Sequence, residues 1–138
     1  MSWAIIADSS CNLRGFQPQA PDTIYRFAPL KINVAGEEII DDDSLDVAEL
    51  NRKVSAEESA SSSACPSVGE WADLFRSADN VIAITISANL SGSYEAAVMA
   101  RDMVLEEDDG RNIFIVNSRA AGGKLELLAV EVDRYRLA

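Results

Sequence analysis

The sequence predicts an α/β fold, with a three-layer α/β/α arrangement around a largely parallel sheet. Short apolar runs typical of buried strands alternate along the chain with segments whose apolar residues recur every three or four positions, as in helices. Three of the predicted strands, 3–7, 81–86 and 113–116, end in small polar residues or glycine. Right-handed crossovers bring such ends to one edge of a parallel sheet, where α/β domains bind ligands. The 138 residues, 48% of them hydrophobic, suffice for one domain with a buried core.

The first third of the chain predicts two strands and a hairpin. The first apolar run ends at residues 8–10, Asp-Ser-Ser. Residues 27–34 predict a second strand, with Pro29 near its start. A turn over residues 35–38 leads into Ile39-Ile40, so a hairpin or an excursion at the edge of the sheet is expected here.

Two capping pairs, Asp46–Glu49 and Ser67–Glu70, predict where the first helices begin. The first of these helices covers about 47–54. The serine-rich stretch 55–63 that follows it is expected to be a surface loop in its first half and part of a binding site in its second. The second helix runs toward Ser77 and has an apolar side made of Val68, Trp71, Ala72, Leu74 and Phe75.

The second half of the chain alternates strands with helices. Residues 81–86 are almost continuously apolar, as expected of a strand covered on both faces, and a helix follows Gly92. Residues 113–116 predict another buried strand, with a polar, glycine-rich exit over 117–123. The last helix, within 120–138, places these residues on one side: Leu125, Leu128, Ala129, Val132 and Tyr135.

The charge balance argues against nucleic acid as a partner. The chain carries 23 acidic and 12 basic residues, a net charge of −11 and an estimated pI of 4.3. A field of this sign repels nucleic acids and anionic membrane surfaces. The acidic runs at 41–43 and 106–109 are expected to be solvated, although the first could also receive a basic partner protein.

Metal and histidine chemistry are not expected. The sequence holds no histidine, and its two cysteines, Cys11 and Cys65, have no metal-ligand spacing. Without a histidine to activate it, Cys65 is not expected to act as a nucleophile. No stretch approaches the ~20 apolar residues that span a bilayer, and no secretory signal is apparent at the start, so a cytoplasmic protein without stable membrane insertion is expected.

The junction between the strand at 81–86 and the helix after Gly92 predicts an anion-binding site. The first amides of a helix lack intrahelical partners and carry the positive end of its dipole, which favours a carboxylate or a phosphate. Ser91 and Ser93 add hydroxyl donors, and glycine between them lets a ligand approach the backbone. The alternative is that Ser91 caps the helix and Gly92 permits a turn.

A second hydroxyl-rich segment, residues 61–67, also leads into a predicted helix. Two such segments could face one pocket, with Ser63 and Cys65 on one side and Ser91 on the other. Clustered hydroxyl and amide donors of this kind stabilise an anionic group by charge-assisted hydrogen bonds.

Five short motifs, in order, resemble the amino-terminal domain of the DegV family of fatty-acid-binding proteins. The match spans nearly the whole chain, and it is the order of the motifs that makes it specific. The motifs are Asp8-Ser9-Ser10, similar to Asp-Ser-Thr; Pro29-Leu30-Lys31-Ile32 leading to Gly36-Glu37-Glu38 and Asp41; Ser63-Ala64-Cys65-Pro66-Ser67, similar to Thr-Ser-Gln-Pro-Ser; Leu90-Ser91-Gly92-Ser93-Tyr94, similar to Leu-Ser-Gly-Thr-Tyr; and Asn117-Ser118-Arg119, where the family usually has Asp-Ser.

The resemblance implies a carrier and not an enzyme. Family members hold one long-chain fatty acid by its carboxylate and, in bacteria, present it to a fatty-acid kinase that makes acyl phosphate, with no catalytic group and no cofactor of their own. By this resemblance Ser63, Ser91 and the Gly92 backbone would bind the carboxylate. Residues expected to support them or line the pocket are Asp8, Ser9, Ser10, Cys65, Ser93, Asn117 and Ser118.

Length is the main departure from the resemblance, because relatives carry a second domain that walls the acyl tunnel. Residues 1–138 would then be the amino-terminal lipid-binding domain alone, as a fragment or a natural short form. Since an acyl chain gains roughly 0.8 kcal/mol per buried CH₂, we expect this chain alone to bind long-chain fatty acid weakly or not at all. Self-association through an open apolar face, including Tyr135 and Leu137, is a further expectation.

Two other classes of function stay open on the residues alone. An enzyme could use the helix start as a phosphate cradle, although Gly122-Gly123-Lys124 is too short a match to the Walker pattern. A non-catalytic interaction module could meet a basic partner through Asp41-Asp42-Asp43.

Overall fold

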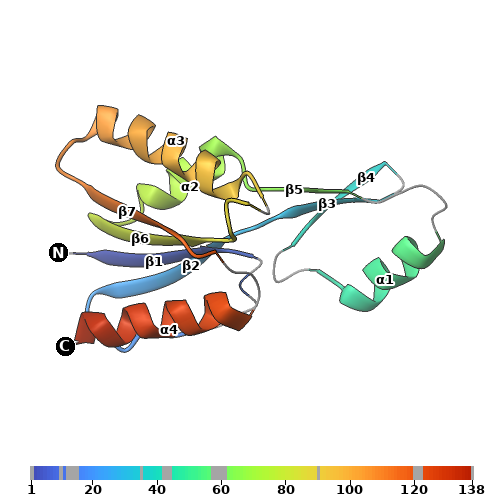
Figure 1. Ribbon diagram of the computed structural model, residues 1–138, viewed down its shortest axis with the longest axis horizontal. Helices are drawn as coiled ribbons and strands as arrows, with labels where there is room; N and C mark the ends of the chain where they lie inside the picture. Colours follow the sequence, from blue (N-terminus) through green and yellow to red (C-terminus); the bar gives the residue numbers. More distant parts are fainter. Residues whose placement is uncertain are drawn as a thin grey trace.

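The protein is an α/β structure in which seven strands and four helices are described. The computed structural model describes residues 2–9, 11, 16–34, 36–41, 45–56, 62–89, 91–119 and 123–137 (Figure 1). In chain order the elements are β1 (Trp3–Asp8), β2 (Thr23–Ala28), β3 (Lys31–Val34), β4 (Glu37–Ile40), α1 (Val47–Ala56), β5 (Ser62–Ala64), α2 (Val68–Phe75), β6 (Asn80–Thr85), α3 (Ser93–Glu107), β7 (Asn112–Asn117) and α4 (Gly123–Leu137).

The main sheet is parallel and lies between two layers of helix. Its strand order is β2-β1-β6-β7, with every neighbouring pair parallel. Helices α2 and α3 cover one face and α4 covers the other, which confirms the predicted three layers (Figure 1). Along β1, Ala4 and Ile6 pack toward α2 and α3, whereas Ile5 and Ala7 pack toward α4. Burial on both faces explains why this strand is apolar from Trp3 to Ala7.

A smaller antiparallel sheet, with strand order β4-β3-β5, projects beside the main one together with α1 (Figure 1). The expected hairpin is confirmed: Lys31 pairs with Ile40 and Ile32 with Ile39. Gly36, at a φ of 78°, makes the turn. Glu37 and Glu38, expected in that turn, belong instead to β4.

The prediction of one strand over residues 27–34 is wrong, because these residues divide between the two sheets. β2 ends at Ala28 in the main sheet, and β3 begins at Lys31 in the smaller one. Pro29, which has no N–H to donate to a ladder, lies in the break, where the chain passes from one sheet to the other.

The surface loop predicted for the first half of residues 55–63 does not start at Ser55, and the end of the second half lies in a strand. Ser55 belongs to α1, while Ser62 and Ser63 lie in β5, where Ser63 pairs with Ile32. Residues 57–61 lie outside the described residues. The serine-rich composition did not predict this strand. The strand forms because its backbone pairs with β3, which is distant in sequence.

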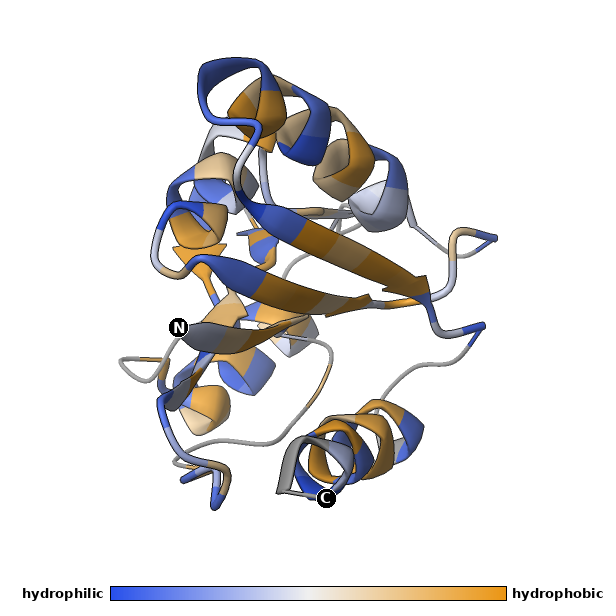
Figure 2. Ribbon diagram, turned by 90° about the vertical axis from the view of Figure 1, so that its left-hand side faces the viewer, coloured by the Kyte–Doolittle hydropathy of each residue, from blue (hydrophilic) through white to orange (hydrophobic). Residues whose placement is uncertain are grey.

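The strand at the edge of the main sheet, β7, is not the buried strand that its apolar residues predict. Ile115 is its one buried residue, and Phe114 is 67% exposed. Figure 2 shows the hydrophobic residues running through the strands, with helices above and below. An apolar run therefore identified the strand but not its place at the edge.

The start of α2 is fixed by the predicted capping box. The Glu70 backbone N–H donates to Ser67 Oγ at 3.1 Å, and the Ser67 N–H donates to Glu70 Oε2 at 2.7 Å. The helix then buries Trp71, Ala72 and Phe75 completely. Lys31 Nζ on β3 lies 3.0 Å from Glu70 Oε1, so the same glutamate ties α2 to the smaller sheet.

Replacement of Ser67 by alanine should destabilise the protein by about 1 kcal/mol, because an orphan amide of α2 then loses its acceptor. Urea denaturation followed by circular dichroism measures the change. Ser55→Ala, at an exposed position of α1, is the matched control and should leave the midpoint almost unchanged. Equal midpoints for Ser67→Ala and the parent protein would contradict this account of the helix start.

Glu70 should make stability depend on acid pH. Partial burial by itself raises the pKa of Glu70, but hydrogen bonds from the Ser67 N–H and the Lys31 ammonium lower it overall below its usual 4.5. A carboxylate with a lowered folded pKa stabilises the protein above its unfolded pKa, and this stabilisation is lost as pH falls through the folded pKa.

Glu70→Gln should therefore destabilise the protein at pH 7 and match it increasingly closely below about pH 4. Urea midpoints measured from pH 7 to pH 3 test this. A difference that stays constant over that range would mean that the charge of Glu70 contributes nothing.

No helix in the described part of the chain has the length and apolar character that crossing a bilayer requires.

Candidate functional site

Strand order places a crevice between the carboxyl ends of β1 and β6. From β1 the chain moves to β2 on one side, whereas β6 and β7 lie on the other, so the direction of winding reverses between β1 and β6. In open α/β sheets this reversal leaves a crevice outside the carboxyl ends of the strands. Asp8 ends β1 and Thr85 ends β6, so the segments that follow them face this crevice.

A cavity of about 410 Å³ lies at this end of the molecule. Three separate segments line it: the connection after β2, the end of β5, and the connection from β6 to α3. Ser63 and Ser91 thus border one cavity, as the sequence analysis expected, although they are far apart in the chain. The lining residues are Leu30, Ser63, Ala64, Cys65, Ile86, Ser91 and Gly92.

The cavity combines hydroxyl and backbone donors with apolar walls. Ser63 is exposed, Ser91 and Cys65 are half-buried, and the lining also includes Leu30 and Ile86. Sequence reasoning did not select these two aliphatic residues as lining residues. Ile86 directly follows β6, and that position was an available signal. Leu30 lies in the break between β2 and β3, inside the single strand that the sequence predicted, so no local signal marked it.

The start of α3 has no side-chain cap. Gly92 is the N-cap residue, with no side-chain hydrogen bond to the first turn, and its carbonyl accepts from the Ala96 N–H at 3.0 Å. Ser91 Oγ accepts from the Ser93 N–H at 3.3 Å. A Cβ at position 92 would lie 3.8 Å from Cys65 Sγ, so Gly92 and Cys65 are close neighbours on the cavity wall. Ser91 therefore precedes the cap position and borders the cavity.

Asp8, Ser9 and Ser93 lie behind the cavity wall. All three are almost completely buried, with exposures of 0%, 1% and 0%. Asp8 Oδ2 accepts from the Ile86 N–H at 2.7 Å and from Ser93 Oγ at 3.0 Å. Ser9 Oγ accepts from the Leu30 N–H at 2.7 Å. Ser10, another expected site residue, lies outside the described residues.

Asn117 and Ser118, also expected near the site, form hydrogen bonds with the end of β6 and the segment that follows it. Asn117 Oδ1 accepts from the Ala88 N–H at 3.2 Å, and Ser118 Oγ donates to the Thr85 carbonyl at 2.6 Å. Neither residue lines the cavity. Within the described ranges, no three His, Cys, Asp or Glu side chains are grouped so that they could hold a metal ion.

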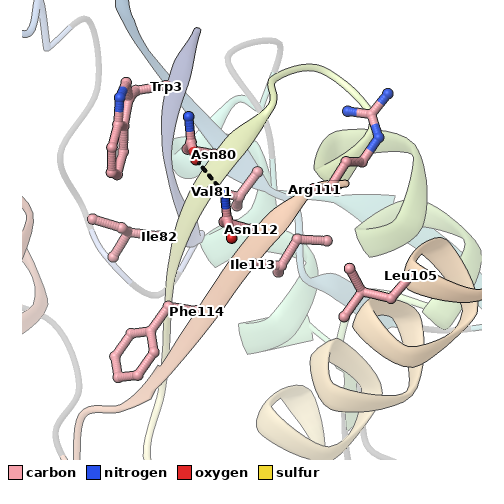
Figure 3. A pocket seen from close by; sticks show the side chains of 9 residues that line it. All are labelled: Trp3, Asn80, Val81, Ile82, Leu105, Arg111, Asn112, Ile113 and Phe114. Carbon is pink, nitrogen blue, oxygen red and sulfur yellow. Dashed lines mark hydrogen bonds between the residues drawn. The ribbon is translucent and has the colours of Figure 1, made fainter. Parts of the chain in front are cut away.

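A larger cavity, of about 520 Å³, lies at the other end of the main sheet, beside the amino-terminal ends of its strands (Figure 3). It includes the first residues of three strands, Trp3, Asn80 and Asn112, and Asn112 Nδ2 donates to Asn80 Oδ1 at 2.9 Å. The guanidinium of Arg111 donates to the Ala78 carbonyl at 2.8 Å. It also forms an ion pair with the Asp108 carboxylate at 3.2 Å, so its charge is already paired. The remaining lining residues are Val81, Ile82, Leu105, Ile113 and Phe114.

The chemistry of the two cavities separates them. The larger one is mainly apolar, and none of the residues that line it carries a hydroxyl group. The smaller one combines two serines with the start of a helix, where an anion is favoured. We therefore take the smaller cavity as the candidate site.

Comparison with known proteins places the whole chain in one family. The family model described as an uncharacterised protein of the DegV family matches residues 2–138. A DegV domain-containing protein of Streptococcus pyogenes is 37% identical over 134 residues, which cover 97% of this chain and 48% of that protein. The chain spans about half the length of the curated relatives that it matches.

Solved structures agree with the sequence match. The fatty acid kinase (Fak) B3 protein of Streptococcus pneumoniae, loaded with linoleic acid, is 36% identical and superposes with a TM-score of 0.96 over 99% of this chain and 49% of its own. A DegV family protein of Eubacterium eligens, loaded with heptadecanoic acid, is 26% identical, with a TM-score of 0.88 over 96% of this chain and 47% of its own. The chain belongs to the DegV family.

Proposed function

We propose that this chain binds the carboxylate of a long-chain fatty acid in the cavity of about 410 Å³ bordered by Ser63 and Ser91. The observation that carries the proposal is that these two hydroxyl-bearing segments, distant in sequence, line one cavity beside the start of α3. The fatty acids in the structures of the Streptococcus pneumoniae and Eubacterium eligens relatives support it.

In this proposal the Ser63 and Ser91 hydroxyls and the Gly92 backbone N–H donate to the two carboxylate oxygens. Hydrogen bonds to an ionised acceptor are about twice as strong as neutral ones. The helix dipole at Gly92 adds a further favourable contribution. Leu30 and Ile86 would contact the first carbons of the acyl chain. The cavity is at the lower end of the range of about 300–1,000 Å³ for ligand pockets, which suits a headgroup and a short part of the chain.

The donors at this site are neutral, and the protein as a whole carries a net charge of −11. A fatty-acid carboxylate must therefore approach against a repulsive field, which salt screens over about 8–10 Å. Local donors at the cavity act within this distance. Binding should accordingly depend on the cavity and only weakly on the distant acidic residues.

We further propose that the chain acts as a carrier that presents the bound carboxylate to a fatty-acid kinase for acyl-phosphate formation. The name of the Streptococcus pneumoniae relative, a fatty acid kinase B3 protein, supports this role. The chain itself would supply no catalytic group. Donors that hold the carboxylate without covalent chemistry leave an oxygen for phosphoryl transfer on the partner enzyme.

Octanoate, a water-soluble fatty acid, should shift the backbone amide signals of Ser91 and Gly92 in ¹⁵N NMR spectra, because its carboxylate accepts from this loop. Ser63→Ala and Ser91→Ala should each weaken octanoate binding by about 1 kcal/mol or more, the usual contribution of one hydrogen bond, and by up to about 3 kcal/mol if the bond is charge-assisted. Titration of the labelled protein gives the affinities.

Two controls make this test specific. Octan-1-ol has a similar tail but no carboxylate, so it should leave the Ser91 and Gly92 signals nearly unchanged. Ser77→Ala, an exposed serine beyond the end of α2, should bind octanoate like the parent protein. Equal shifts with octanoate and octan-1-ol, or full affinity in both site variants, would sink the carboxylate site.

A further inference from the structure

The end of β1 contacts several walls of the candidate cavity at once. Asp8 Oδ2 accepts two hydrogen bonds, from the Ile86 N–H at 2.7 Å and from Ser93 Oγ at 3.0 Å. Ile86 lines the cavity, and Ser93 begins α3 directly after the lining residue Gly92. One buried carboxylate oxygen therefore joins the exit of β6 to the start of α3.

Ser9, the next residue, holds the part of the cavity wall that contains Leu30. Its hydroxyl accepts from the Leu30 N–H at 2.7 Å, and its own N–H donates to the Ala28 carbonyl at 2.8 Å. Leu30 lines the cavity between β2 and β3. Ser9 is 1% exposed, so both of its bonds have one partner shielded from water.

From this arrangement we propose that Asp8 and Ser9 are the positioning residues of the cavity. They hold Leu30, Ile86 and the Ser91-Gly92 loop at the spacing that a carboxylate requires, without contacting the ligand themselves. This inference rests on the proposed function, because it assigns the support of the same site.

The physical reason is preorganisation. Hydroxyl and amide donors bind an anion well only if their positions are already fixed, and fixed positions require hydrogen-bonded support. The connection from β6 to α3 has a glycine at the N-cap, which leaves the backbone freer than other residues would. The hydrogen bond from Ser93 Oγ to Asp8 fixes this connection from behind.

The test uses variants of the support and measures binding at the site. Ser93→Ala and Ser9→Ala should each weaken octanoate binding about three- to tenfold, the equivalent of one hydrogen bond in each case. Ser93→Thr keeps the hydroxyl and should restore near-parental affinity. Asp8→Asn keeps the shape but removes the charge, and should weaken binding by a similar factor.

A matched control separates positioning from general stability. Asp133, on α4, is also a buried carboxylate, 4% exposed, and accepts from the Gln19 N–H at 2.8 Å and the Ala20 N–H at 3.0 Å. Gln19 and Ala20 come just before β2, so these bonds lie near the amino-terminal ends of the strands, whereas the cavity lies near their carboxyl ends. Asp133→Asn should lower the urea midpoint yet leave the octanoate affinity unchanged.

Hydrogen exchange gives a second readout that needs no ligand. In the free protein, Ser9→Ala should speed exchange of the Leu30 amide, and Asp8→Asn should speed exchange of the Ile86 amide. Asp133→Asn should affect neither. If Asp8→Asn fails to fold, the two serine variants still decide the question.

The outcomes distinguish the two proposals. Parental octanoate affinity in folded Ser9→Ala and Ser93→Ala would overturn the positioning role while leaving the carboxylate site intact. An equal loss of affinity in Asp133→Asn would also overturn it, because the effect would then be one of stability. Because weak binding is expected of this chain alone, octanoate is titrated into the millimolar range. If the parent protein does not respond even there, the proposed function fails, and unchanged exchange of Leu30 and Ile86 in the variants would overturn the positioning role as well.

Discussion

The carboxylate of Asp8, at the end of the central strand β1, links the exit of β6 to the start of α3 beside the candidate cavity. Its Oδ2 atom accepts from the Ile86 N–H at 2.7 Å and from Ser93 Oγ at 3.0 Å, and Asp8 is fully buried. A buried carboxylate is costly unless hydrogen bonds compensate it. The same bonds that compensate Asp8 therefore fix the connection from β6 to α3, on which Ser91 and Gly92 lie.

Local patterns were sufficient to predict much of this fold. The Ser67–Glu70 pair predicted the start of α2, and both reciprocal hydrogen bonds are present. Residues 3–7 predicted a short buried strand, and β1 is buried between the helix layers in the centre of the sheet. These features depend on neighbours within a few residues, or on burial that shows directly in composition.

The features that sequence reasoning missed depend on contacts between distant residues. β5 exists because Ser63 pairs with Ile32, and the exposure of Phe114 follows from the place of β7 at the sheet edge. The placement of Ser63 and Ser91 on one cavity was expected from two hydroxyl-rich segments that lead into helices and from family resemblance. The bonds that Asp8 and Ser9 make to Ile86 and Leu30 had no local signal, since they cross 78 and 21 residues of sequence.

A crystal structure of this protein with bound octanoate tests the central claim most directly. The account predicts carboxylate oxygens within about 2.5–3.2 Å of Ser63 Oγ and of Ser91 Oγ or the Gly92 N–H nitrogen, with the first carbons against Leu30 and Ile86. A carboxylate bound in the cavity between Trp3 and Phe114, with the Ser63 and Ser91 hydroxyls free of ligand, would contradict it.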